Sequence, residues 1–196
     1  MAAVTTRLAA PELRRPRTVQ VGALFACAAS AMVYFGVLAL YVSRRAEARE
    51  AGIEWFPEGV VELGPSGWIF WTFVLAAFTM QWAVVAIRDE DRPHAYIALA
   101  ITMMFGASVF NQLWFIINDT GFVLANSEAE LLFYVMIGTF ITFLIIAMGF
   151  VLLTALRALF GQYSPRQNDG VSAAAMYWYT VSAMYWVTWI AVFVTK

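Results

Sequence analysis

Long apolar runs alternate with short polar segments along this chain, and each run is long enough to cross a bilayer. About 20 apolar residues in a helix match the roughly 30 Å thickness of the hydrocarbon layer. The runs are continuously apolar, which favours helices over the alternating strands of a membrane barrel. The pattern therefore predicts an all-α integral membrane bundle of five transmembrane helices, at residues 19–43, 67–87, 94–118, 131–160 and 172–195.

The polar connections predict where the helices begin and end. Residues 44–50 should carry the first helix beyond the membrane, with Gly52 as its C-terminal stop. Ser66 is expected to cap the second helix. The link at 88–93 is so short that the second and third helices must be antiparallel neighbours. The fourth run is longer than the membrane is thick, so it should tilt or protrude.

Composition places the chain among membrane proteins and excludes several kinds of metal site. Of its 196 residues, 62% are hydrophobic and 13% are charged, whereas soluble domains are about half apolar and a quarter charged. The net charge of −1 gives no sign of nucleic acid binding. Because His94 is the single histidine, a haem with two histidine ligands and a histidine-built copper or zinc site are excluded within this chain.

Basic residues predict how the chain is oriented. Residues 1–18 form a basic tail that we expect to be disordered and cytoplasmic, followed by a membrane domain at 19–196. A cleaved signal peptide is disfavoured, because the apolar run after the tail is too long for one. An inside N-terminus gives eight basic residues inside (Arg7, Arg14, Arg15, Arg17, Arg88, Arg92, Arg157, Arg166) and four outside (Arg44, Arg45, Arg49, Lys196). The positive-inside rule therefore places the C-terminus outside.

The last apolar run carries an aromatic face. At about 100° per residue, several aromatic side chains and a small polar notch fall within one narrow sector of the helix. One interpretation is a helix flank that packs on its neighbours, which elementary physics favours. The other is a docking face for a larger membrane partner. The predicted partner-packing face consists of Ala174, Trp178, Ser182, Tyr185 and Trp189.

Strongly polar groups are scarce at membrane depth, where the strongest are the amides Gln81, Asn111, Gln112 and Asn118. Hydrogen bonding between helices is their favoured role, and the wet path of a small transporter or channel is the alternative. The acidic residues 89–91 offer ligands for a cation, but a solvated turn is favoured because arginines flank them. No nucleophile–base pair, phosphate loop or metal-ligand set is visible, so we predict no catalytic, cofactor-binding or metal-binding residue.

Several segments follow one another in a distinctive order. They are VGALFACAASAMVYFGVLALYVSRRAEA (21–48), WFPEGVVEL (55–63), QWAVVAIRDEDR (81–92) and RALFGQYSP (157–165). In this order they resemble the short, five-helix form of subunit III of haem-copper terminal oxidases, as found in actinobacterial oxidases. The family's first two helices are absent from that form, and the likeness covers nearly the whole chain from Val19 onward.

The last run carries the closest match to that family. Tyr177 and Trp178 match the start of the family motif Tyr-Trp-His-Phe-Val-Asp, whereas its His and Asp positions hold Tyr179 and Ser182. The Gln and Glu usual in the third of the five helices, and the two His of the fourth, are not matched. The resemblance therefore implies a diverged relative that keeps the packing role and has lost the acid and imidazole groups.

The resemblance also implies a function. This would be a non-catalytic, lipid-holding component of a haem-copper oxidase in aerobic respiratory electron transport, packed against catalytic subunit I and other subunits of the respiratory complex. Haem and copper are expected in partner subunits, phospholipid around this chain and no cofactor within it. The implied location is a bacterial plasma membrane, as a multi-pass protein. An accessory subunit of a nitric oxide reductase-type complex and a small transporter or channel are the alternatives.

Overall fold

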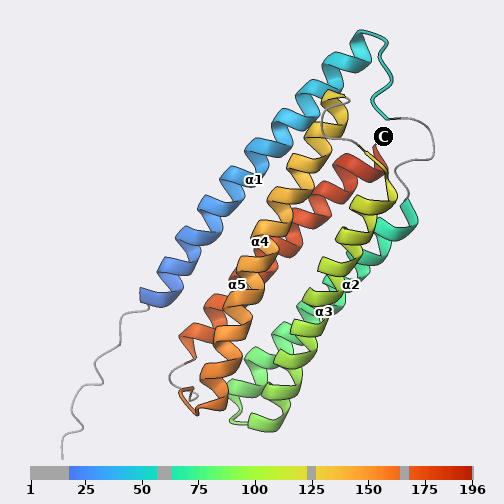
Figure 1. Ribbon diagram of the computed structural model, residues 1–196. Helices are drawn as coiled ribbons and strands as arrows, with labels where there is room; N and C mark the ends of the chain where they lie inside the picture. The colour runs from blue at the N-terminus through green and yellow to red at the C-terminus, as the bar shows by residue number, and fades with distance from the viewer. Residues whose placement is uncertain (1–17, 57–62, 123–126, 164–167, 196) are drawn as a thin grey trace, which may run out of the picture.

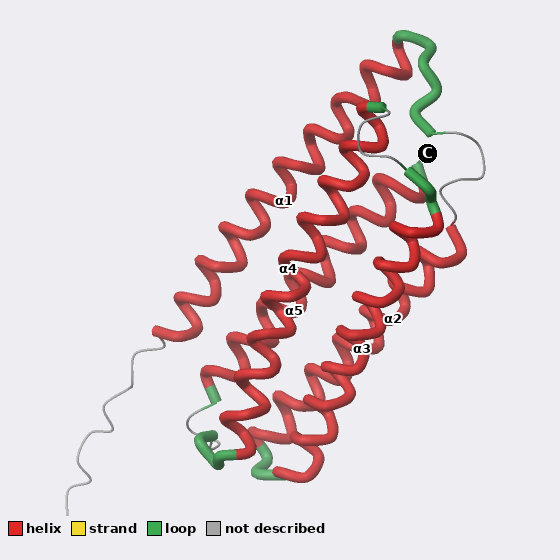
Figure 2. The backbone as a smooth tube through the Cα atoms, viewed as in Figure 1, coloured by secondary structure: helices red, strands yellow, loops and turns green. Residues whose placement is uncertain are grey.

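The computed structural model describes residues 18–56, 63–122, 127–163 and 168–195. Every regular element in these ranges is a helix (Figure 1, Figure 2). The elements are α1 (Thr18–Glu50), α2 (Leu63–Arg88), α3 (Arg92–Asp119), α4 (Glu128–Leu159), α5 (Asp169–Thr188) and the π-helix η1 (Trp189–Val194). The all-α prediction is confirmed. Nearly all of the predicted basic tail, and the predicted topological charges Arg166 and Lys196, lie outside the described residues.

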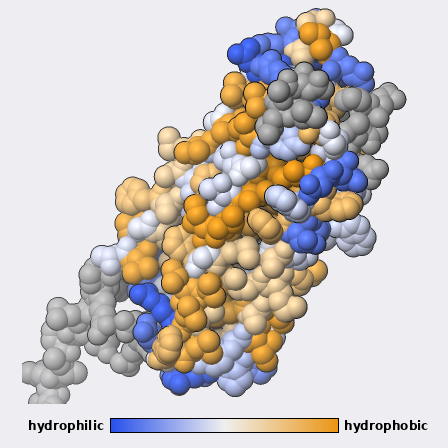
Figure 3. Space-filling view, viewed as in Figure 1, coloured by the Kyte–Doolittle hydropathy of each residue, from blue (hydrophilic) through white to orange (hydrophobic). Residues whose placement is uncertain are grey.

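Four of the described helices, α1 to α4, are long and apolar enough to cross a membrane. They also direct large apolar side chains outward, such as Phe25 on α1 and Phe78 on α2. Figure 3 shows apolar side chains over most of the visible face, with hydrophilic ones gathered mainly toward its ends. So much exposed apolar surface is typical of a protein surrounded by lipid or by other membrane subunits.

The helices form one bundle in which α5 is central (Figure 1). α5 packs against α1, α2 and α4, whereas α1 contacts only α5 and α4 to any extent among the described helices. α2 and α3 run side by side and are joined by a tight turn, as the short link at 88–93 predicted. α5 carries Tyr, Trp, Ser and Thr side chains, and these lie largely inside the bundle.

Local sequence signals set two of the helix ends. Gly52 follows α1 with a φ of 71°, and the Ile53 N–H donates to the Ala48 carbonyl oxygen at 2.9 Å. This is the glycine stop predicted from the sequence. At the start of α4, the Ser127 hydroxyl oxygen accepts the Glu130 N–H at 3.2 Å. That hydrogen bond satisfies one of the unpaired amides of the first turn.

The start of α2 differs from the prediction. The helix begins at Leu63, so Ser66 lies within its first turn and is not its N-cap. The Ser66 hydroxyl donates to the Leu63 carbonyl oxygen at 3.1 Å. Pro65 does not block the earlier start, because the first turn of a helix needs no N–H from that position.

The end of the last helix also differs. The predicted α-helical run at 172–195 begins earlier, at Asp169, and continues beyond Thr188 as η1. The Thr195 N–H donates to the Ile190 carbonyl oxygen at 3.0 Å, five residues back, which defines the wider π turn. Arg45 of α1 donates to the Ala191 carbonyl oxygen at 2.7 Å. An arginine from α1 thus satisfies a carbonyl group in the terminal turn of the chain.

Candidate functional site

The aromatic face predicted on the last helix lies inside the bundle. Trp178, Ser182 and Tyr185 are at most 2% exposed, and Ala174 is 4% exposed. The chain's own helices already cover these side chains, so their burial favours packing within the bundle over docking of a partner. The predicted docking face stays a prediction that no partner chain tests. Trp189 is half-buried, and its ring centroid lies 5.0 Å from that of Phe70 on α2.

The Trp178 ring of α5 reaches Gly106 of α3 and lies near Met148 of α4. A Cβ atom at Gly106 of α3 would lie 3.0 Å from Cη2 of Trp178 and 3.1 Å from Cγ of Met148 on α4. Glycine is therefore the residue that lets the indole fit between these helices. Small residues have this role in membrane bundles, where helix association depends on close packing.

Tyrosine hydroxyl groups join helices that are distant in sequence. Tyr177 of α5 shares a hydrogen bond of 3.0 Å with Ser30 of α1, and Tyr185 donates to the Ser66 carbonyl oxygen of α2 at 2.8 Å. Tyr34 of α1 forms a further hydrogen bond with Thr188 of α5. These links were not predicted. The available signal was the presence of tyrosines within apolar runs, since a buried tyrosine usually finds a hydrogen-bond partner.

The two positions that depart from the family motif have separate surroundings. The Tyr179 hydroxyl donates to the Gln81 side-chain oxygen of α2 at 2.8 Å, at the outside of the bundle. The Ser182 hydroxyl is buried and donates to the Trp178 carbonyl oxygen within α5 at 2.9 Å. Tyr179 therefore links two helices, whereas Ser182 satisfies its own hydroxyl locally.

The four amides predicted as the main polar groups do not meet. Gln81 bonds across helices, as the favoured interpretation expected, but Gln112 donates to Ser108 and Asn118 to the Trp114 carbonyl, both within α3. Asn111 is exposed. The hydrogen bonds recorded for the described residues join none of these amides to another, so the structure offers no support for a shared wet path through them.

The acidic turn between α2 and α3 stabilises the start of α3. One carboxylate oxygen of Asp91 accepts the His94 backbone N–H at 3.3 Å, and the other lies 2.6 Å from His94 Nδ1. Hydrogen bonding from the His94 side chain, and then from its backbone, lowers the pKa of Asp91. The resulting stabilisation is present above the ordinary carboxyl pKa and is lost as the pH falls through the lowered one. Among the described residues, no group of three His, Cys, Asp or Glu side chains could hold a metal ion.

Glu90 in this turn adopts a backbone conformation that favours glycine. Its φ is 63°, and the next amide, Asp91 N–H, donates to the Ala86 carbonyl oxygen at 2.9 Å. The left-handed conformation costs an ordinary residue about 1–2 kcal/mol, which glycine at position 90 would avoid. Part of this gain is offset because glycine has more conformational freedom to lose when the chain folds. We therefore expect Glu90→Gly to raise the free energy of unfolding in detergent by roughly 0.5–1 kcal/mol.

A denaturant titration followed by circular dichroism measures this change. Asp89→Gly is the matched control, because Asp89 has no positive φ and glycine there should only lower stability. Similar gains in both variants would contradict the conformational explanation.

Comparison with known proteins gives a consistent set of relatives. Residues 13–195 match the family model of cytochrome c oxidase subunit III. The chain is 30% identical to cytochrome c oxidase subunit 3 of Gallus gallus over 146 residues, covering 73% of this chain and 56% of that protein. It is 31% identical to that of Paracentrotus lividus over 160 residues, covering 80% and 59% respectively. The matches thus span less than two thirds of the length of these curated relatives.

Proposed function

The chain belongs to the cytochrome c oxidase subunit III family, and we propose that it is a non-catalytic, subunit III-like component of a haem-copper oxidase. The family match over residues 13–195 is the observation that carries the proposal. The proposed role is to pack against the catalytic subunit and to hold phospholipid around it. The proposed location is the plasma membrane of a bacterium.

The interior of the bundle supports a role based on shape. The centre is filled by side chains such as Trp178, Phe140 and Met80, and the buried hydroxyl groups of Tyr34 and Tyr185 have partners inside the chain. An oxidase needs metal ligands, which the proposal assigns to partner subunits carrying haem and copper. What this chain offers a partner is its outer apolar surface on α1 to α4.

Purification of the native complex through a tag on this chain tests the proposal. We expect the haem-carrying subunit to co-purify at a fixed ratio, measured by quantitative mass spectrometry, and a tag on that subunit to recover this chain in return. The isolated chain should show no haem absorbance and no stoichiometric copper. Migration of this chain apart from every haem protein would contradict the proposal, as would a fixed association with a nitric oxide reductase alone.

A further inference from the structure

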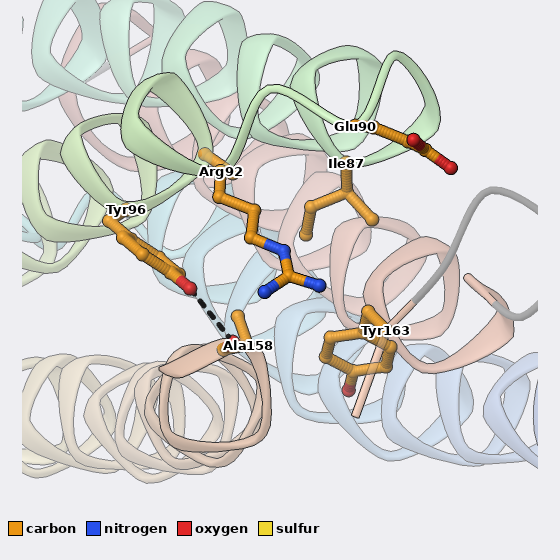
Figure 4. A pocket seen from close by; sticks show the side chains of 7 residues that line it. Ile87, Glu90, Arg92, Tyr96, Ala158 and Tyr163 are labelled. Carbon is orange, nitrogen blue, oxygen red and sulfur yellow. Dashed lines mark hydrogen bonds between the residues drawn. The ribbon is translucent and has the colours of Figure 1, made fainter. Parts of the chain in front are cut away.

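A pocket of about 170 Å³ lies where the α2–α3 turn faces the end of α4 (Figure 4). Its walls are mostly apolar or aromatic and include Ile87, Ala95 and the rings of Tyr96 and Tyr163. Since about 10–15 Å³ on this measure admits one water molecule, the pocket has room for a group of several heavy atoms. We define these residues, together with Glu90, Arg92 and Ala158, as the turn pocket.

Arg92 supplies the positive charge of the turn pocket. Figure 4 shows its guanidinium group directed into the space between Tyr96, Ala158 and Tyr163. Within the described part of the chain, the Arg92 side chain has no ion pair or hydrogen bond. A guanidinium group presents five donors in a planar fork, and an oxyanion is the partner that matches this geometry.

The other polar groups of the turn pocket leave this charge available. Glu90 lines the pocket, but Figure 4 shows its carboxylate directed away from Arg92. The Tyr96 hydroxyl donates to the Ala158 carbonyl oxygen at 3.1 Å, so neither of these groups requires the guanidinium as a partner. Arg92 is also exposed, which leaves the pocket open to a ligand from outside the protein.

We propose that the turn pocket binds a phosphate oxyanion through the guanidinium group of Arg92. The location suits the phosphodiester of a phospholipid, because the pocket lies at a polar end of apolar helices, where headgroups meet the hydrocarbon layer. Apolar walls beside the charge would accept the glycerol part of such a lipid. Inorganic phosphate has the same oxyanion chemistry. The proposal rests on the membrane placement in the proposed function and does not depend on the identity of the partner subunit.

The test uses the full chain, stripped of lipid in a nonionic detergent and a phosphate-free buffer. It is titrated by calorimetry with inorganic phosphate in one arm and a short-chain phosphatidylglycerol in the other. Arg92→Gln should weaken binding about tenfold or more, since charge-assisted hydrogen bonds are lost. Arg88→Gln is the matched control, because Arg88 lies at the other side of the same turn, at the end of α2, is exposed and does not line the pocket. Binding by the control should stay within about twofold of the original chain.

A second variant keeps the test decisive if Arg92→Gln fails to fold. Glu90→Gln removes the negative charge of a residue that lines the pocket and should tighten binding of an anion about two- to threefold. If only the lipid binds, the pocket is assigned to a lipid headgroup. If inorganic phosphate binds equally well, the pocket is assigned to the free ion. The proposal is overturned if neither probe binds, if Arg88→Gln weakens binding as much as Arg92→Gln, or if Glu90→Gln weakens it. Co-purification with the oxidase is a separate measurement, so the two proposals can fail independently.

Discussion

Replacing Trp178 by alanine is expected to lower the free energy of unfolding of the detergent-solubilised chain by about 3 kcal/mol. The indole is fully buried beside Gly106 of α3 and Phe73 of α2, and alanine would leave most of its volume empty. The loss comes from dispersion contacts that the surrounding helices cannot replace without moving. The expected loss of stability is at the low end of the range for truncating a buried aromatic side chain. In detergent, the unfolded reference state also keeps the indole out of water, so transfer from water contributes little. A titration with denaturing detergent, followed by circular dichroism, measures this loss.

Trp68→Ala is the matched control for this experiment. Trp68 is on α2 and is 71% exposed, so its loss should change stability by less than about 0.5 kcal/mol. Equal losses in the two variants would contradict the buried position of Trp178. A stable Trp178→Ala chain that no longer joined its complex would instead restore the docking interpretation.

Gly106→Val is expected to destabilise the bundle by about 2 kcal/mol or more. The first added carbon already lies 3.0 Å from Trp178 and 3.1 Å from Met148, and valine adds two more carbons to that space. Met148 is flexible and can yield, but the buried indole ring cannot move without displacing α5 from its neighbours. The measurement is the same unfolding titration.

Gly138→Val on α4 separates this steric effect from the general effect of losing a glycine. No atom lies within 4 Å of a Cβ at Gly138, so its replacement should change stability by less than about 0.5 kcal/mol. If valine changed stability equally at both glycines, the close contact at Gly106 would not be the cause of the loss.

The positions of the helices followed from the sequence because the signals that separate them are local. Apolar runs end at charged or glycine-containing segments, and Gly52 and the short 88–93 link produced the stop and the tight turn that were expected. Ser66 misled the prediction because a serine in the first turn can bond to a carbonyl group as readily as it can cap an amide.

The inner and outer faces of the helices could not be predicted in the same way. In a soluble bundle, polar residues mark the outside, but both sides of these helices are apolar. Trp178 and Trp68 therefore look alike in the sequence, although one is central and the other faces outward. The turn pocket was missed for a different reason. It joins residues near 92 to residues near 160, and only the folded bundle brings these segments together.

The π-helix at the end of the chain has a consequence for side-chain direction. An α-helix rotates each successive residue by about 100°, whereas a helix with hydrogen bonds five residues apart rotates each residue by less. The wider turn of η1 changes the direction of the side chains that follow it, and Val192 and Phe193 are buried in this segment. Deleting one residue from this segment would convert the turn to ordinary α geometry and swing the Phe193 ring toward the lipid. The π turn thus sets the direction in which the last buried side chains of the bundle point.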